Sequence, residues 1–166
     1  MKINVYFAGP LFTHAEITWN KLLAESIEKV NPNIELFLPQ IKTAAALKCL
    51  PPDFKRVQQI CLDGIDESDT VIAVLDGADA DSGTCFECGY AYAKGIPVIG
   101  IRTDERSGED KGMNAMLTQS CKQIVRLDLV KGRTDELAAL AVKIVEAVRT
   151  VITSTTSAPN KSLERP

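Results

Sequence analysis

The chain has 166 residues, of which 45% are hydrophobic and 25% are charged, with 19 basic residues, 22 acidic residues and a net charge of −3. These values fit one globular domain and exclude a chain that is disordered throughout, and the acidic balance excludes the basic footprint of a duplex nucleic-acid binder. Because no run of about 18 apolar residues and no signal-peptide core is present, we expect a cytoplasmic protein without a membrane span.

The first half of the chain begins with a β-rich apolar segment at residues 2–8, which Gly9-Pro10 ends. Thr13 and Glu16 then have capping-box spacing, and an apolar stripe at helical spacing follows to residue 30. The next predicted elements are a strand at residues 34–38, a loop or irregular helix at 40–52 and a helix at 53–67.

The second half continues with a buried strand at residues 70–75 and a polar loop at 76–83. Thr84 and Glu87 have the spacing of a second capping box, so a helix is predicted from Thr84 to about Lys94. The remaining predicted elements are a strand at 97–102, a loop at 103–113, a short helix near 112–117, a strand at 123–127 and a helix from about Thr134. We expect one domain over residues 1–152 and a polar, flexible tail over 153–166.

Five short strands that alternate with helices predict an α/β fold with a doubly wound parallel sheet. We expect the flavodoxin-like strand order 2-1-3-4-5, in which ligands bind beyond the carboxyl ends of the strands at the switch point. Those ends are Ala8-Gly9-Pro10, the loop from Asp76 to Gly83, and the loop after residue 102.

Acidic residues concentrate at this predicted ligand edge. Eight of the 22 carboxylates fall between positions 63 and 87, and no Lys, Arg or His occurs from Val57 to Ala93. Partly buried carboxylates without cationic neighbours have raised pKa values and are candidates for acid, base or nucleophile roles. A solvated acidic face with helix caps is the alternative interpretation.

The segment D-S-G-T-C-F-E-C-G-Y-A, residues 81 to 91, contains the most informative pattern. Glu87 lies near the start of a predicted helix at the ligand edge, where a substrate can reach it. Gly89 lies inside that helix, where glycine costs roughly 1 kcal/mol relative to alanine, which indicates close approach of a backbone or a ligand. Cys85 and Cys88 lack a thioredoxin-like context and have acidic neighbours, so a redox role is the weaker interpretation.

Cofactor motifs are missing from the sequence. Residues 5–12 contain neither a dinucleotide-binding nor a phosphate-loop pattern, and His14 is the only histidine. We therefore expect no cofactor and no metal site.

Taken together, four segments resemble the nucleoside 2-deoxyribosyltransferase family. They are Val5 to Pro10, Asp63 with Asp69 to Ala73, Asp81 to Ala91, and Asn114 to Met116. The resemblance implies that Glu87 is the nucleophile, that Tyr6 positions it, and that Asp81 and Asp63 contact the deoxyribose hydroxyl and the base. It also implies that Asn114 is lent to the site of a neighbouring subunit, and hence a homo-oligomer. The further residues expected to bind substrate are Ala8, Gly9, Pro10, Asp76 and Gly83.

The activity implied by this resemblance is transfer of 2-deoxyribose between purine or pyrimidine bases, through a covalent glycosyl-glutamate with retention, as in nucleoside salvage. The partners would be 2′-deoxynucleosides and free nucleobases. One alternative is a nucleoside 5′-monophosphate N-glycosidase that uses the same glutamate, although its relatives carry Ser and Arg in the first loop, where this chain has Ala8 to Phe12. A non-catalytic nucleotide-binding module is the other alternative.

Overall fold

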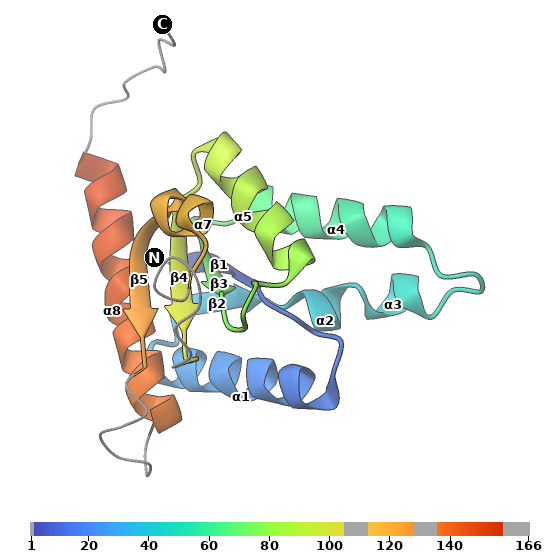
Figure 1. Ribbon diagram of the computed structural model, residues 1–166, viewed down its shortest axis with the longest axis horizontal. Coiled ribbons are helices and arrows are strands. Elements are labelled where there is room, and N and C mark those ends of the chain that lie inside the picture. Colours follow the sequence, from blue (N-terminus) through green and yellow to red (C-terminus); the bar gives the residue numbers. More distant parts are fainter. Residues whose placement is uncertain (1, 105–112, 128–135, 158–166) are drawn as a thin grey trace, which may run out of the picture.

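The structure is a computed structural model that describes residues 2–104, 113–127 and 136–157 (Figure 1). Its strands are β1 (Ile3–Ala8), β2 (Ile34–Phe37), β3 (Thr70–Val74), β4 (Val98–Arg102) and β5 (Cys121–Arg126). Its helices are α1 (His14–Val30), α2 (Pro39–Lys42), α3 (Ala44–Leu47), α4 (Phe54–Asp66), α5 (Ser82–Lys94), α7 (Ala115–Ser120) and α8 (Glu136–Ser157). None of the described helices is long and apolar enough to cross a membrane.

All neighbouring strands pair in parallel, and their order across the sheet is β2-β1-β3-β4-β5. This confirms the predicted flavodoxin-like fold. Every residue of β3 and β4 is buried, because helices cover both faces of the sheet, and both strands therefore have continuous apolar sequences. The order reverses between β1 and β3, so the switch point lies at their carboxyl ends.

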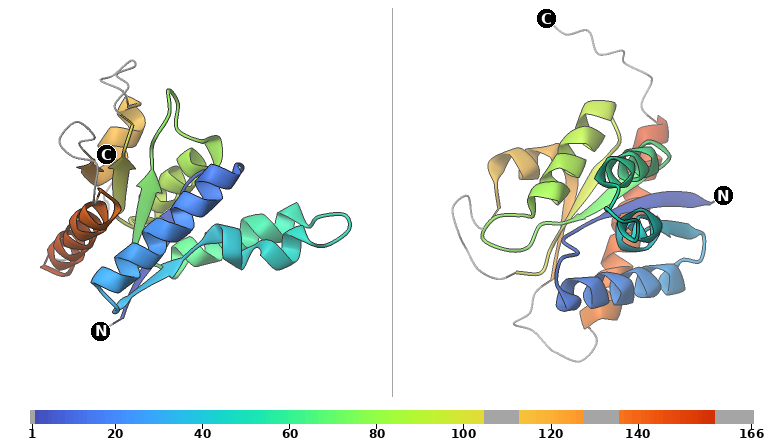
Figure 2. Two further views of the ribbon diagram at one scale, coloured as in Figure 1. Left: turned by 90° about the horizontal axis from the view of Figure 1, so that it is seen from below. Right: turned by 90° about the vertical axis from the view of Figure 1, so that its right-hand side faces the viewer.

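The two faces of the sheet carry different helices (Figure 2). Helices α1 and α8 pack on one face, and α4 and α5 pack on the other. Successive residues of a strand point to opposite faces. Strand β1 accordingly directs Val5 and Phe7 to the α1/α8 face, and Tyr6 and Ala8 to the α4/α5 face. This alternation decides which side of the switch point receives the Tyr6 hydroxyl.

Residues 40–52, predicted as a loop or irregular helix, contain most of α2 and all of α3. Figure 1 shows α2, α3 and α4 extending away from the sheet as an arm, on the side opposite α8. The arm exposes several large apolar side chains, namely Ile41, Leu50 and Phe54.

Several predicted boundaries are wrong by a few residues. Helix α5 begins at Ser82 rather than Thr84, and β5 begins at Cys121 rather than at residue 123. The domain boundary expected at residue 152 stays a prediction, and helix α8 runs through it to Ser157. The expected helix start at Thr134, residues 105–112 of the expected loop and residues 158–166 of the expected tail lie outside the described residues.

Candidate active site

Tyr6 and Glu87 lie together at the site although 81 positions separate them in the chain. Tyr6 belongs to the central strand β1, and Glu87 belongs to the second turn of α5. The Tyr6 hydroxyl donates a hydrogen bond of 2.6 Å to Glu87 Oε1. Tyr6 is fully buried between the sheet and its covering helices. The carboxylate is therefore held by a phenol that has almost no freedom to move.

The surroundings of Glu87 bring its titration close to neutral pH. Burial raises the pKa of Glu87 from 4.5 to about 7; the Tyr6 hydrogen bond opposes this rise and the Asp81 charge adds to it. Burial and the neighbouring Glu87 carboxylate hold the pKa of Tyr6 well above its ordinary value. The phenol thus stays protonated and donates. A carboxylate of this kind suits a nucleophile or a general base.

Asp81 is the N-cap of α5. Its Oδ2 accepts the Thr84 N–H at 2.9 Å and the Thr84 hydroxyl at 3.1 Å. The predicted Thr84–Glu87 capping box is therefore wrong, since Thr84 is itself capped and Glu87 turns to Tyr6. The cap also fixes the Asp81 carboxylate close enough to Glu87 to raise its pKa. The structure brings these two predicted carboxylates together.

Helix α4 presents Cys61, rather than Asp63, to the Tyr6–Glu87 pair. The Cys61 thiol lies close enough to the Tyr6 hydroxyl and to Glu87 for each to influence its pKa. Asp63 is exposed and accepts a hydrogen bond of 2.7 Å from Gln59 Nε2. Two residues along an α-helix correspond to a rotation of about 200°, which places these side chains on opposite sides. The structure does not bring Asp63 to Glu87.

Sequence reasoning missed Cys61 as a site residue. The signal available for it was its place in the apolar stripe of the predicted helix at residues 53–67, a pattern that marks a core-facing position. The resemblance to the family pointed to Asp63 instead. The family resemblance and the helical periodicity therefore pointed to different residues. The periodicity was the better guide to which residue lies next to Tyr6.

Asp76, expected to contact substrate, is engaged by protein groups. Its carboxylate accepts the backbone N–H groups of Thr103 and Asp104, at 2.6 and 3.0 Å, and the Thr103 hydroxyl. The buried Arg102 donates to the Gly77 carbonyl at 2.8 Å beside it. These bonds tie the loop after β3 to the loop after β4. Asp76 thus shapes a cavity of about 480 Å³ on the α1 side of the switch point.

The turn after β1 packs tightly against the rest of the chain. Ala8 is fully buried, and Gly9 and Pro10 are half-buried. Asn20 Nδ2 donates a hydrogen bond of 2.9 Å to the Pro10 carbonyl, which fixes the turn over the start of α1. Gly83 is exposed in the first turn of α5. These four predicted residues line the carboxyl edge, with Ala8 beneath it.

Asn114 lies on the outer side of α5, at the start of α7. Its side-chain oxygen accepts the Met116 N–H at 2.9 Å. With Gly89 and Tyr92 it lines a cavity of about 470 Å³ between the two helices. Apart from Gly89's two chain neighbours and its own helix backbone, no atom of the described chain lies within 4 Å of a Cβ at Gly89, so the described residues do not make the close approach expected there.

The cysteine pair of α5 does not have the character of a redox site. Burial raises the pKa values of Cys85 and Cys88, and the Asp81 carboxylate adds to the rise at Cys85. Both side chains therefore favour the neutral thiol over the thiolate. In the part of the chain that the structure describes, no three His, Cys, Asp or Glu side chains are grouped as metal ligands would be.

Comparisons with known proteins add an independent line of observation. The family model described as nucleoside 2-deoxyribosyltransferase matches residues 5–116. An uncharacterized protein of Ureaplasma parvum is 34% identical over 99 residues, or 55% of this chain, and the match spans 61% of that protein's length.

Solved structures share the fold. A conserved protein from Enterococcus faecalis superposes with a TM-score of 0.72 and 28% identity, over 91% of this chain and 99% of that one. A 2-deoxyribosyltransferase from Bacillus psychrosaccharolyticus superposes with a TM-score of 0.60 and 22% identity, over 74% of this chain and 85% of that one. At this identity the second likeness is one of fold.

Proposed function

The chain belongs to the nucleoside 2-deoxyribosyltransferase family, and from this membership we propose that it transfers 2-deoxyribose between nucleobases, with Glu87 as the covalent nucleophile. The observation that carries the proposal is the hydrogen bond of 2.6 Å from the buried Tyr6 hydroxyl to Glu87 Oε1. This bond orients a carboxylate beside the carboxyl edge of the sheet, where ligands of doubly wound folds bind.

The proposed reaction has two displacements at one carbon. A Glu87 oxygen forms a bond to the anomeric carbon while the bond from that carbon to the base nitrogen breaks. The bonding electron pair leaves with the base, which takes up a proton. A nitrogen of a second base then attacks the same carbon, the ester bond to Glu87 breaks, and that base loses a proton. Two inversions give net retention, as in retaining glycosidases.

Tyr6 and Asp81 have supporting roles in this proposal. The Tyr6 hydroxyl orients the carboxylate before attack. It can then donate a hydrogen bond to an oxygen of the ester that forms. The Asp81 carboxylate, fixed by its cap on Thr84, is proposed to contact the sugar hydroxyl or the base. Negative charge near the sugar also stabilises the oxocarbenium character of the transition state. Asp63 has no part in this version of the mechanism, because Cys61 occupies the position next to Tyr6.

The surroundings favour an uncharged nucleoside over a nucleotide. The turn from Ala8 to Phe12 carries no Lys or Arg that could bind a phosphate. Arg102, which lies at the same edge, donates to the main chain and pairs with Asp104. We therefore propose 2′-deoxynucleosides and free nucleobases as substrates, in a salvage role.

Asn114 is proposed to complete the site of a neighbouring copy of this chain. It lies exposed on the outer side of α5, beside the exposed side chains of Met116 and Tyr92. If two chains share each site, mixing inactive Glu87→Ala and Asn114→Ala proteins restores activity in hybrid oligomers. Mixtures that stay inactive, although hybrids form, would contradict a shared site.

The proposal is tested by a base-exchange assay with deoxyinosine and free adenine, followed by chromatography. The native protein is expected to form deoxyadenosine and hypoxanthine, and Glu87→Ala is expected to form neither. Glu25→Ala is a matched control, because Glu25 is exposed on α1 and paired with Lys21. Intact-protein mass spectrometry should detect a 2-deoxyribosyl adduct on native protein that Glu87→Ala lacks.

Other results would lead elsewhere. Release of hypoxanthine without any new deoxynucleoside, whichever of several acceptor bases is supplied, would identify a hydrolase. Reaction only with a deoxynucleoside 5′-monophosphate would identify the monophosphate N-glycosidase. Binding without turnover, unchanged in Glu87→Ala, would identify a non-catalytic module. Equal rates with adenosine and deoxyadenosine would contradict the proposed selection of the 2-deoxy sugar.

A further inference from the structure

Phe37 of the edge strand β2 is stacked against the tyrosine that orients the candidate nucleophile. Phe37 and Tyr6 are directly opposite each other in the β1–β2 pairing. Their ring centroids lie 5.2 Å apart and their planes meet at 17°. Offset stacks of this kind have a preferred geometry, so each ring restricts where the other can lie. Phe37 is therefore one contact away from the hydrogen bond to Glu87.

Helix α4 meets the tip of the Phe37 ring at Gly64. A Cβ at residue 64 would lie 2.6 Å from Phe37 Cζ and 2.7 and 2.8 Å from its two Cε atoms. Real Cβ contacts essentially never come this close, so any larger residue at this position would displace the ring. Gly64 is buried, and these distances place its helix in direct contact with the ring. The absence of a side chain at Gly64 thus sets where the ring lies.

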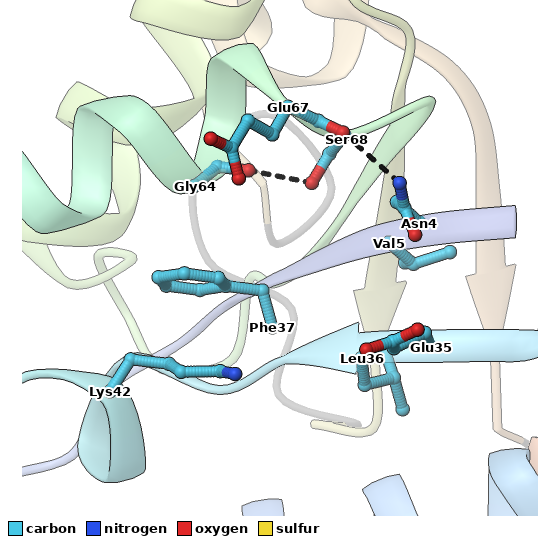
Figure 3. Close-up of a pocket in the computed structure, with 9 residues that line it drawn as sticks. All are labelled: Asn4, Val5, Glu35, Leu36, Phe37, Lys42, Gly64, Glu67 and Ser68. Carbon is cyan, nitrogen blue, oxygen red and sulfur yellow. Dashed lines mark hydrogen bonds between the residues drawn. The ribbon is translucent and has the colours of Figure 1, made fainter.

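The ring has open space beside it as well as contacts. A cavity of about 270 Å³ is lined by Phe37, Lys42, Gly64 and nearby residues of β1, of β2 and of the chain just after α4. Figure 3 shows the ring between Gly64 and the Lys42 side chain, and the Lys42 Nζ lies 5.7 Å from the ring centroid. Because one side of the ring borders this cavity, a pushed ring has room to move without breaking the fold.

We propose that Phe37, seated against Gly64, is a positioning residue that keeps the Tyr6 hydroxyl on the Glu87 carboxylate. The role of this contact in turnover rests on the proposed function, but the geometric role does not. A ring displaced toward the cavity no longer stacks on Tyr6, which gains freedom to rotate away from Oε1. Small displacements around a reacting group can cost large factors in rate.

Two variants and two matched controls test the proposal. Gly64→Ala pushes the ring and Phe37→Leu removes it. Gln58→Ala is the helix control, since Gln58 is exposed on the same helix α4, and Phe54→Leu is the aromatic control, since Phe54 is 69% exposed. Circular dichroism verifies the fold of each variant. If Gly64→Ala does not fold, the double variant Gly64→Ala/Phe37→Leu relieves its clash and takes its place.

The first readout is the titration of Glu87 in carbon-13-glutamate-labelled protein, with its signal identified by Glu87→Gln. Since the Tyr6 hydrogen bond lowers the Glu87 pKa, loosening it should raise the titration midpoint in both test variants, by up to about one pH unit. Both controls should titrate as the native protein does. Unchanged midpoints in the folded test variants would overturn the proposal.

The second readout is base exchange, which separates this inference from the proposed function. The test variants should lose about tenfold or more in kcat with little change in KM, and the acidic limb of the pH profile should move to higher pH. A moved midpoint in a protein whose native form exchanges no base would refute the proposed function alone. A higher KM together with an unchanged titration midpoint of Glu87 would refute the positioning role.

Discussion

The carboxylate of Asp81 caps helix α5 and, at the same time, raises the pKa of Glu87 further along that helix. The two effects depend on different properties of the side chain. Capping needs an oxygen that accepts the Thr84 N–H, whereas the effect on Glu87 needs negative charge. Asparagine supplies the first without the second and is an equally good N-cap. One substitution can therefore separate them.

We expect Asp81→Asn to lower the pKa of Glu87, because the repelling charge is lost while the Tyr6 bond remains. The titration midpoint of Glu87 should move to lower pH with little change in stability. Asp81→Ala should produce the same movement and also lose about 1 kcal/mol of unfolding free energy, because the cap is lost. Urea unfolding and the carbon-13 titration measure the two effects. A midpoint that rises in Asp81→Asn would show that the sign assigned to the charge is wrong.

The raised pKa of Glu87 also makes stability depend on pH. Its folded pKa of about 7 exceeds the ordinary 4.5, so folding favours the protonated form. The stability that Glu87 contributes is complete below about pH 4.5 and is lost as the pH rises through about 7, to a total of roughly 3 kcal/mol. Glu87→Gln removes this titration and can keep the Tyr6 partner.

Urea unfolding of native protein and Glu87→Gln across this pH range isolates the contribution, since all other groups are shared. Glu87→Gln should become the more stable protein, relative to native, as the pH rises. The difference should change by up to roughly 3 kcal/mol between about pH 5 and about pH 8.5. A difference independent of pH would contradict the raised pKa.

Gly89→Ala should stabilise the isolated chain. Gly89 lies inside α5, where glycine costs about 1 kcal/mol relative to alanine, and beyond its own helix backbone no atom of the described chain would touch the added methyl group. Thermal unfolding at low protein concentration should show a higher Tm. If the substitution instead destabilises the protein or changes its oligomeric state, another copy of the chain packs against this glycine.

The five cysteines should differ sharply in reactivity. Burial raises the pKa of Cys121 to about 11 and also raises those of Cys61, Cys85 and Cys88, whereas Cys49 is exposed on the arm. At about pH 8 a disulfide reagent should modify one thiol quickly, and Cys49→Ser should abolish this fast phase. Rapid modification of Cys85 or Cys88 would revive the redox interpretation.

The sequence supported the strand order more strongly than the details of the site. Alternation of apolar strands with amphipathic helices leaves few topologies for a chain of this length. The parallel sheet was predicted from this alternation. The start of α5 was misplaced because Asp81, Thr84 and Glu87 follow one another at intervals of three residues. Both Asp81 and Thr84 therefore fit the sequence pattern of an N-cap. Long-range contacts decided between them, since Glu87 is drawn to Tyr6 on β1.

The stack of Phe37 on Tyr6 was not predicted either. Both residues alternate correctly in their strands, but their register is set only when β2 pairs with β1. Gly64 carries no periodic signal in the sequence, and its contact with Phe37 depends on how α4 crosses the sheet. A contact that depends on how three elements pack together cannot be predicted from the residue pattern within a single element.

The Tyr6–Glu87 bond joins two parts of the molecule that differ in resistance to local opening. Strand β1 is hydrogen-bonded to β2 on one side and β3 on the other, so its amides exchange with solvent only when the sheet itself opens. Glu87 belongs to a helix whose first two residues, Ser82 and Gly83, are exposed and whose start is capped by the Asp81 side chain. The hydroxyl side of this bond should therefore resist local opening more than the carboxylate side, and hydrogen exchange of the β1 and α5 amides would measure the difference.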